Sequence, residues 1–497
     1  MKTAIVGGGV GGIMAALFLV KEGFDVTIYE KEERLGGRLT FVEKDGYKID
    51  KGPTIVLLPE MLSELLFQAG IQEDEYSLQR CDPLYDIHFA NGETYTKHAS
   101  VDQQVKEIQK KYPGNEEGFK RFMEDMKERF ELGKPQFLQE SFVKKINLIK
   151  PKTISALYKL KAFQSVSKQL ENYFTAEELR IAYALQTLYI GGNPYETPAI
   201  YSLVSYSEHE HGIYYLEGGY ASLIEVLEKA CERKGINIVK NAYVSNIIKN
   251  QDVATGLVVN DEIIAANSII LNGDLPVVQR LVSINKPYVP SSSCLLLYMG
   301  IDGIYENASL HQFYMSTSFK ETMIDVFKNK QIPINPCYYV FHPSLVDSTL
   351  APDGKGVLYT LVPVPSAGVV DWDIEKDLLA ERIITSMEKN GFPELKKRID
   401  WIEIRSPKEA MAEGLFQGGS FGIAPVLGQS GPFRPQLQPF KEKNIFAVGA
   451  SIHPGGGIPI VMQGAKLLSE YMINEYATHS SGKEVTIHEN ISGLRTM

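Results

Sequence analysis

The sequence lacks the features that mark several common classes of protein. Its four cysteines include no Cys-x-x-Cys pair, so neither a zinc motif nor a disulfide framework is indicated. No apolar run reaches the length of a membrane-spanning helix. The N-terminal stretch MKTAIVGGG is typical of a strand entering a glycine turn, not of a signal peptide. A formal net charge of −10 argues against a nucleic-acid partner. We therefore expect a cytoplasmic protein, either soluble or attached to the surface of a membrane.

The N-terminal segment carries the strongest pattern in the chain. Residues 3–6 (TAIV) and 25–30 (DVTIYE) predict two buried strands, and the apolar stretch between them predicts a helix that ends at Gly23. Gly7, Gly9 and Gly12 form G-x-G-x-x-G at the turn between the first strand and that helix. These glycines allow a tight turn, backbone access to a pyrophosphate and close packing of helix on strand. The pattern predicts a dinucleotide at the helix N-terminus.

Residues after the second strand indicate which dinucleotide this is. Glu30 closes the strand, where a carboxylate accepts hydrogen bonds from a ribose. The chain continues with EKEERLGGRL and IDKGPTIV, and here it resembles the FAD-binding amine oxidase and phytoene desaturase superfamily. The resemblance implies FAD as the cofactor. It assigns further cofactor contacts to Lys31, Gly37, Arg38, Gly52, Pro53 and Thr54.

A second glycine cluster lies near the C-terminus, in the stretch ASIHPGGGIPIV at residues 450–461. Consecutive glycines let backbone approach a ligand without a Cβ in the way, and Pro459 suits the first turn of a helix. The resemblance implies that this loop seats the flavin ring and that the helix N-terminus faces the ring edge that becomes negative on reduction. It assigns contacts to Gly449, Gly456, Gly457, Ile458 and Pro459. No cysteine follows Cys337, so we expect FAD to be bound non-covalently.

Within this superfamily the chain is most similar to the bacterial carotenoid desaturases. The stretches GASIHPGGGIPIV, LQTLYIGGNPYETPAIYSL and FGIAPVLGQSGPFRPQ resemble the diapophytoene desaturases of staphylococci, and the likeness runs over about residues 3–475. It implies an enzyme that introduces double bonds into a hydrophobic C30 polyisoprenoid by hydride transfer to flavin. One departure is Ala450 after Gly449, where many flavin amine oxidases have an acid.

Other functions stay open on the sequence alone. One is an oxygenase or oxidase of the same fold that acts on the terminal methyl groups of a diapocarotenoid. A second is a flavin amine oxidase, and a third is a prenyl-binding escort protein without catalysis. The intact glycine clusters at both ends favour an enzyme over an escort protein.

The expected fold class is α/β, with an FAD-binding Rossmann-like domain of the glutathione reductase or amine oxidase type. The resemblance places this discontinuous domain at residues 1–85, 215–280 and 436–476, with the backbone of Val244 at the adenine. A mixed-sheet substrate domain is expected at 86–100, 189–214 and 281–435. A helical, membrane-facing subdomain is expected at 101–188 and a mobile tail at 477–497. The sequence contains no internal repeat and no indication of oligomeric state.

His453 is the candidate catalytic residue, because it is a titratable group beside the expected flavin seat. The alternative is that it only hydrogen-bonds the glycine loop. For Arg434, in FRPQ, three readings stay open: it pairs with FAD, it shapes the loop, or it lies at the surface. His209 and His211 have a spacing that could suggest a metal, but no further ligand set accompanies them, so we expect no metal site.

Residues 141–168 combine seven lysines and no acidic residue with apolar residues at helical spacing, namely Ile154, Leu157 and Leu160. That composition favours an interfacial helix on anionic lipid, which would give access to a lipid substrate. We therefore expect peripheral attachment to the inner face of the cell membrane. A solvated lysine face is the alternative.

Overall fold

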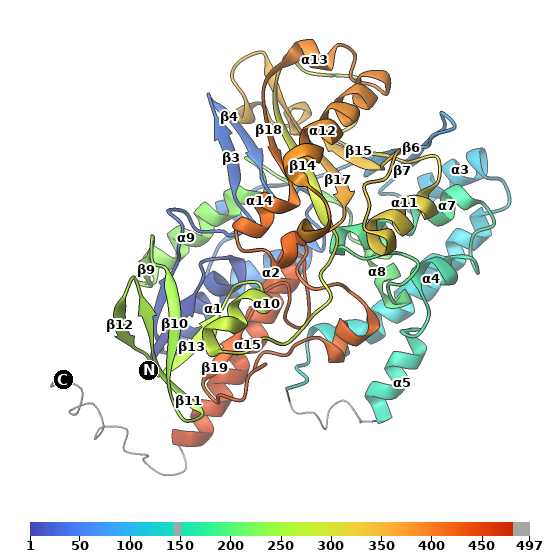
Figure 1. Cartoon of the computed structure of the whole chain (residues 1–497). Coiled ribbons are helices and arrows are strands. Elements are labelled where there is room, and N and C mark those ends of the chain that lie inside the picture. The colour runs from blue at the N-terminus through green and yellow to red at the C-terminus, as the bar shows by residue number, and fades with distance from the viewer. Residues whose placement is uncertain (144–150, 481–497) are drawn as a thin grey trace.

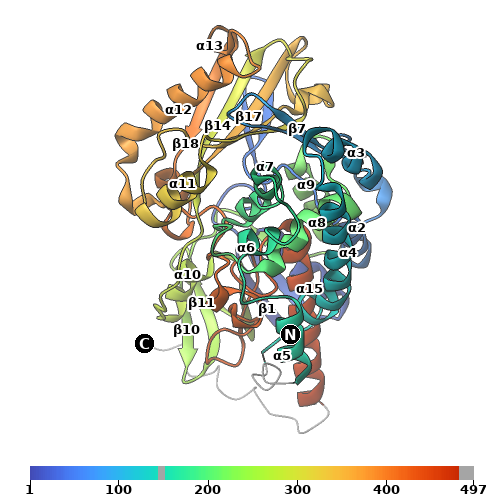
Figure 2. The same cartoon turned by 90° about the vertical axis from the view of Figure 1, so that its right-hand side faces the viewer.

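The computed structural model describes residues 1–143 and 151–480 of the chain. It contains one parallel and one mixed main β-sheet, with helices packed on both and a helical layer alongside (Figures 1 and 2). This is the α/β architecture that the sequence predicts. The division into domains at the boundaries given above stays a prediction.

The parallel sheet is assembled from distant parts of the chain. Its strand order is β19 (Ile445–Ala447), β13 (Ser268–Leu271), β1 (Lys2–Val6), β2 (Asp25–Tyr29) and β9 (Asn237–Val239). Every neighbouring pair is parallel, which requires crossover connections. Helix α1 (Val10–Lys21) provides the connection between β1 and β2. All five strands come from the three ranges that the sequence analysis assigns to the cofactor domain.

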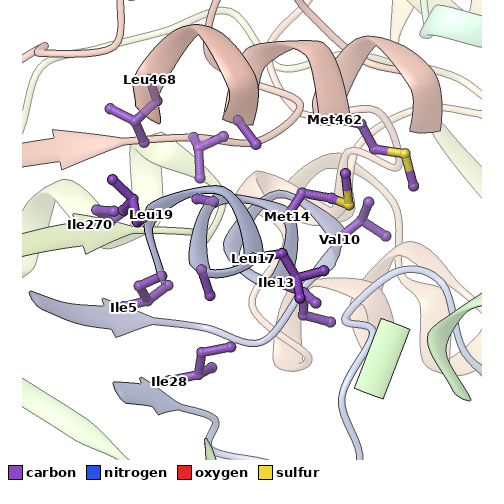
Figure 3. Close-up of a cluster of buried hydrophobic side chains, with 14 of the residues drawn as sticks. Ile5, Val10, Ile13, Met14, Leu17, Leu19, Ile28, Ile270, Met462 and Leu468 are labelled. Atoms are coloured by element: carbon purple, nitrogen blue, oxygen red, sulfur yellow. The ribbon is translucent and has the colours of Figure 1, made fainter. Parts of the chain in front are cut away.

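Helix α1 is apolar on nearly all sides because it lies between the sheet and helix α15 (Ile458–Ser480). Figure 3 shows its side chains, Ile13 and Leu17 among them, in one buried cluster with residues of β1, β2, β13 and α15. Helices α2 (Pro59–Ala69) and α9 (Leu223–Arg233) contribute to the same core. Residues 477–480, expected in the tail, belong to α15, and the rest of the expected tail lies outside the described residues.

A small antiparallel sheet adjoins this core, with β10 (Val244–Asn250), β11 (Val253–Val259) and β12 (Glu262–Ala265) in that order. The stretches INIVKNAYVSNII and VATGLVVN predict β10 and β11, whereas β12 is not predicted from the sequence. The signal that could have found β12 is the pair Asn260-Asp261, because both residues have positive φ, as in a two-residue type I′ hairpin turn.

The mixed sheet has seven strands in the order β18 (Ile399–Arg405), β14 (Ser293–Asp302), β17 (Lys355–Val364), β16 (Tyr338–Phe341), β15 (His311–Tyr314), β6 (Tyr85–His88) and β7 (Thr94–Lys97). Only the β15–β6 pair is parallel among them. Alternating residues of β14 face opposite sides. Leu295 and Leu297 pack with helix α12 (Trp372–Lys389), whereas Leu296 and Tyr298 belong to the core on the other side.

A helical layer lies beside this second face of the mixed sheet (Figure 2). Its helices are α3 (Val101–Lys111), α4 (Glu116–Gly133), α5 (Pro151–Lys159), α6 (Val166–Leu170), α7 (Glu177–Ala182) and α8 (Ser202–Glu210). The remaining strands and α-helices are the hairpin β3 (Phe41–Lys44) and β4 (Tyr47–Asp50), the pair β5 (Leu78–Arg80) and β8 (Tyr214–Leu216), and the short helices α10 (Leu275–Val278), α11 (Phe319–Ile324), α13 (Leu395–Arg398) and α14 (Pro407–Ala412).

A buried ion pair joins the layer to the sheet. Lys97 Nζ of β7 lies 2.6 Å from Glu208 Oε2 of α8, and both side chains are fully buried. The hydroxyl of Tyr85 and the amide of Gln186 also donate to Glu208. All three donors converge on Oε2, while Oε1 is buried without a hydrogen-bond partner among the described residues. The ion pair links β7 of the sheet to α8 of the helical layer.

Candidate functional site

One cavity of about 1570 Å³ runs from the turn between β1 and α1 into the space between the mixed sheet and the helical layer. Both glycine clusters of the sequence line it, and so do residues from the mixed sheet and from α8. The chain thus brings both glycine clusters and strands of the mixed sheet to one cavity.

The first glycine turn leaves no room for side chains. Gly7 has φ +102°, and a Cβ added there would collide with the backbone oxygen of Asn272. A Cβ on Gly9 would lie 2.9 Å from Asn272 Oδ1, and one on Gly12 would collide with Gly7 O. Gly7 and Gly9 line the cavity where α1 begins, so bare backbone and a helix N-terminus face it together.

Glu30 lies at the same end of the cavity with its side chain buried. Its carboxylate accepts the N–H of Gly8 at 2.7 Å and the N–H of Glu32 at 3.0 Å. These bonds fix the carboxylate beside the turn, and each oxygen keeps a lone pair for a hydroxyl donor.

The other residues predicted to contact the cofactor are gathered around this end. Arg38 pairs with Asp274 at 3.2 Å, and Lys31 donates to the backbone oxygen of Glu413 at 3.3 Å. At Gly52 a side chain would collide with the backbone of Arg38. The cavity is lined by Lys31, Gly37, Arg38, Gly52, Pro53, Thr54 and Val244.

The second glycine loop forms another part of the wall. Gly449 and Gly457 have φ of +129° and +98°, which favours glycine, and α15 begins immediately afterwards at Ile458. The cavity is lined here by Gly449, Gly456, Gly457, Ile458 and Pro459. Helices α1 and α15 therefore both direct their N-termini towards one cavity, as a ligand with phosphate groups and an electron-rich ring would require. The residues present fit a flavin dinucleotide.

Farther from the glycine turns the cavity wall is apolar. Residues of the second face of the mixed sheet and of the helical layer form it, including Leu185, Leu188, Leu203, Val204, Leu296, Phe313, Met315 and Leu361. Such a wall suits a long hydrophobic ligand.

His453 is not among the described residues that line the cavity. Its ring is buried, with Nε2 2.9 Å from the backbone oxygen of Glu140 and Nδ1 3.2 Å from that of Gly431. The edge of the ring packs against Phe142. Burial lowers the pKa of His453 to about 4, so the imidazole is neutral near pH 7. This geometry favours the alternative in which His453 hydrogen-bonds the loop.

A hydrogen-bonded chain that the sequence analysis missed ends at the cavity wall. The Tyr339 hydroxyl lies 2.9 Å from Thr54 Oγ1 and 2.7 Å from His311 Nδ1. Tyr339 and Thr54 line the cavity, whereas His311 is buried behind them. Burial lowers the pKa of His311 to about 3 and raises that of Tyr339. The stretches HQFY and YYVF carry no motif, and only the pairing of β15 with β16 brings the tyrosine to the histidine.

The remaining candidates, His209, His211 and Arg434, lie in different surroundings. His209 is buried, with its ring nitrogens near Tyr183 and the backbone of His98, whereas His211 faces Glu60 at 3.2 Å. No cluster of three or more potential metal ligands occurs within residues 1–143 and 151–480. Arg434, by contrast, lines the cavity.

The comparisons with known proteins agree with this geometry. The family model for flavin containing amine oxidoreductase matches residues 10–472. A 4,4'-diapolycopen-4-al dehydrogenase of Metabacillus indicus is 51% identical over 96% of this chain and 98% of its own length. A 4,4'-diapophytoene desaturase of Staphylococcus haemolyticus is 31% identical over 96% of this chain and 99% of its own. The solved cyclohexylamine oxidase of Brevibacterium oxydans shares the fold, with a TM-score of 0.62 at 15% identity over 96% of this chain and 99% of that one.

These likenesses confirm the predicted fold class and the resemblance to carotenoid desaturases. The chain belongs to the flavin containing amine oxidoreductase family, and it is a flavin-dependent oxidoreductase.

Proposed function

We propose that the chain is an FAD-dependent dehydrogenase of C30 diapocarotenoids. The observation that carries this proposal is that one cavity joins two regions. The first is the glycine cradle, formed by the turn of Gly7 and Gly9 and the loop of Gly449, Gly456 and Gly457, and the second is a long apolar compartment. A polyisoprenoid has no charge to bind, so its affinity must come from burial of apolar surface, about 0.8 kcal/mol per CH₂. The wall between the mixed sheet and the helical layer offers that surface.

Two oxidations of such a substrate have support. The motifs LQTLYIGGNPYETPAIYSL and FGIAPVLGQSGPFRPQ favour desaturation of diapophytoene, as do relatives near 30% identity that are named for that reaction. The relative at 51% identity is named for dehydrogenation of a diapolycopenal. Because that likeness is much stronger over the same length, we favour oxidation of a terminal aldehyde to a carboxylic acid. Water adds to the aldehyde and supplies the second oxygen. The hydrated carbon then gives up a hydride, and a hydroxyl of the hydrate loses a proton. Desaturation is the second candidate.

FAD, when bound, would supply the two-electron acceptor of this oxidation. Gly7 and Gly9 would leave room for its pyrophosphate, and Glu30 would accept a ribose hydroxyl. Val244 would meet the adenine through its backbone. The loop of Gly449, Gly456 and Gly457 would seat the ring. Among the described residues no cysteine lies in this loop, so we propose non-covalent binding.

The oxidation also releases a proton, and we assign its first acceptor to Tyr339. The hydroxyl of Tyr339 faces the cavity wall with the imidazole of His311 hydrogen-bonded behind it. Because burial raises its pKa, the Tyr339 hydroxyl keeps its proton near pH 7. Oη can therefore take the substrate proton only as its own proton moves to the lone pair on Nδ1 of the neutral His311. His453 has no comparable access to the cavity.

Mutations at the glycine cradle should separate the cofactor contacts. A Gly9→Val change should abolish FAD binding, because its side chain would fill the approach of the pyrophosphate. A Glu30→Ala change should weaken FAD binding by about 10- to 100-fold. The reason is that a hydrogen bond to a charged group contributes roughly 1.5–3 kcal/mol of binding free energy. Glu22→Ala, at the exposed far end of α1, is the control.

Fluorescence titration of the apoprotein with FAD measures these affinities. Acid precipitation of the wild-type protein should release all of its flavin to the supernatant. Flavin retained on the precipitate would contradict non-covalent binding, and unchanged affinity of Glu30→Ala would contradict the ribose contact.

The two proton-transfer candidates predict different kinetics. Tyr339→Phe should slow flavin reduction by at least about 100-fold, as loss of a general base does. His453→Gln should slow it less than tenfold and leave its pH profile between 6 and 8 unchanged, because the pKa of His453 lies near 4. Stopped-flow absorbance of the flavin measures both rates.

Tyr305→Phe removes another buried tyrosine hydroxyl, one that donates to Pro393 away from the cavity, and serves as the control. A large effect of His453→Gln with a small effect of Tyr339→Phe would reverse the assignment.

Product analysis tests the proposed reaction. The FAD-loaded protein should convert a diapocarotenoid aldehyde into the corresponding acid, with one flavin reduced per acid formed. Colourless diapophytoene should be recovered unchanged under the same conditions. Chromatography and mass spectrometry of the extracted lipids measure both. New conjugated double bonds in diapophytoene, with the aldehyde untouched, would instead establish the second candidate.

We further propose that the protein takes its substrate from a membrane surface. The cavity is lined by Leu157 of α5 and by Phe433, which is 50% exposed, so the cavity reaches the surface near these residues. Tyr158 and Phe163 beside them are 79% and 70% exposed. Lys144, Lys145 and Lys150 of the predicted basic segment lie outside the described residues. No described helix has the length and apolar content to span a membrane.

The exposed aromatic residues provide a test of this surface. Replacing Tyr158 and Phe163 with serine should reduce sedimentation with anionic lipid vesicles several-fold, because apolar burial at the interface is lost. Ile263 and Ile334 are equally exposed elsewhere and give the control double-serine variant. Equal sedimentation of the two variants would contradict attachment through α5.

A further inference from the structure

Arg434 differs from every other buried cation of the described chain. Four lysine or arginine residues are classed as buried, and three of them have a carboxylate within ion-pair distance. Lys97 pairs with Glu208 at 2.6 Å, Arg129 with Asp125 at 3.7 Å and Arg405 with Glu413 at 2.7 Å. No carboxylate of residues 1–143 or 151–480 lies within 4.0 Å of the Arg434 guanidinium.

The surroundings of Arg434 leave part of it unsatisfied. Nη1 donates to the backbone oxygen of Gln429 at 3.0 Å, and Nη2 donates to that of Ala450 at 2.5 Å. Nε is buried without a hydrogen-bond partner among the described residues. The side chain lines the cavity, and a Cβ added to Gly455 would lie 3.9 Å from Nε. The free donor is therefore beside the second glycine loop.

Neighbouring charges do not neutralise this cation. Asp274 acts on Arg434 electrostatically, but its carboxylate already pairs with Arg38 and accepts the hydroxyl of Ser451 and the N–H of Phe416. Two arginines thus share one carboxylate. A buried cation without its own partner costs several kcal/mol of stability, and arginine does not lose its proton to escape that cost. Such a group is expected where a ligand supplies the missing negative charge.

We propose that Arg434 is an anion subsite of the cavity and that its anion is the flavin ring in the reduced state. This inference rests on the proposed function. Arg434 holds Ala450 of the loop that would seat the ring, and the N-terminus of α15 adds positive potential at the same place. The oxidised ring is neutral and the reduced ring carries negative charge. Arg434 therefore stabilises the reduced state selectively and makes the bound flavin a stronger oxidant.

The midpoint potential of the bound flavin tests this assignment without substrate turnover. In Arg434→Gln the loop keeps a hydrogen-bond donor but the cation is lost. In this variant the affinity for reduced flavin, relative to that for oxidised flavin, should fall at least tenfold. The midpoint potential should therefore fall by at least about 30 mV for a two-electron couple. Arg434→Lys keeps the charge, so its potential should stay closer to that of the wild type. Anaerobic titration against a reference dye measures the potentials.

Matched variants keep the outcome interpretable. Arg398→Gln removes a cation that packs on Tyr305 and does not line the cavity, so its potential should equal that of the wild type. Arg434→Met provides a second neutral variant if Arg434→Gln does not fold. Flavin content and thermal unfolding of each variant establish that the site is intact.

A carboxylate at the end of a substrate or product could also supply the anion. In that case the potential would be unchanged in Arg434→Gln, whereas a polyene carboxylic acid, followed by its absorption shift, would bind less tightly. That result would overturn the flavin assignment, and so would a variant that changes neither quantity. A wild-type protein that holds no flavin would contradict the proposed function itself, while equal potentials in flavin-loaded proteins would contradict only the role of Arg434.

Discussion

Three strand ends meet at Asn272, and this close approach is the constraint on which the rest of the structure depends. The residue directly follows β13, the strand between β1 and β19 in the parallel sheet. The backbone oxygen of Asn272 lies where a Cβ on Gly7 would be. Its side-chain Oδ1 lies too close for a Cβ on Gly9 or on Gly12. Its Nδ2 donates to the backbone oxygen of Val448 at 3.1 Å. The glycine turns from opposite ends of the chain are thereby brought together around one side chain.

This meeting point determines the polarity of the cavity. Helices α1 and α15 start from the two turns and pack against each other, so their N-termini open into the same space. Their backbone N–H groups supply positive potential without a cluster of charged side chains. The opposite end of the cavity lies against sheet and helix side chains and is apolar. One cavity therefore has an end lined by glycine turns and helix N-termini and an end lined by apolar side chains.

Sequence reasoning succeeded where backbone geometry dictates the residue. A position that admits no Cβ has to be glycine, so such positions can be recognised from a single sequence. For that reason the glycine turns, and with them the strands of the parallel sheet that they follow, were predicted well. Sequence reasoning did not find the pair Tyr339 and His311, because strand pairing brings them together and neither neighbours a motif. The role of His453 stays a prediction, and closeness to a glycine loop along the chain does not by itself mean that the ring faces the cavity.

The same distinction explains how one fold can persist while most of the sequence changes. At 15% identity an amine oxidase retains the architecture of this chain, which is possible because strand order and glycine turns demand little of the remaining residues. The substrate compartment has no such backbone requirement, and its wall comes from side chains on β14, β15, β16 and α8. Substitutions there alter the shape and polarity of the wall while leaving the turns around Asn272 untouched. Under the function proposed above, substrate choice would be carried by residues such as Phe313 and Leu203, and cofactor choice by positions at which only glycine fits.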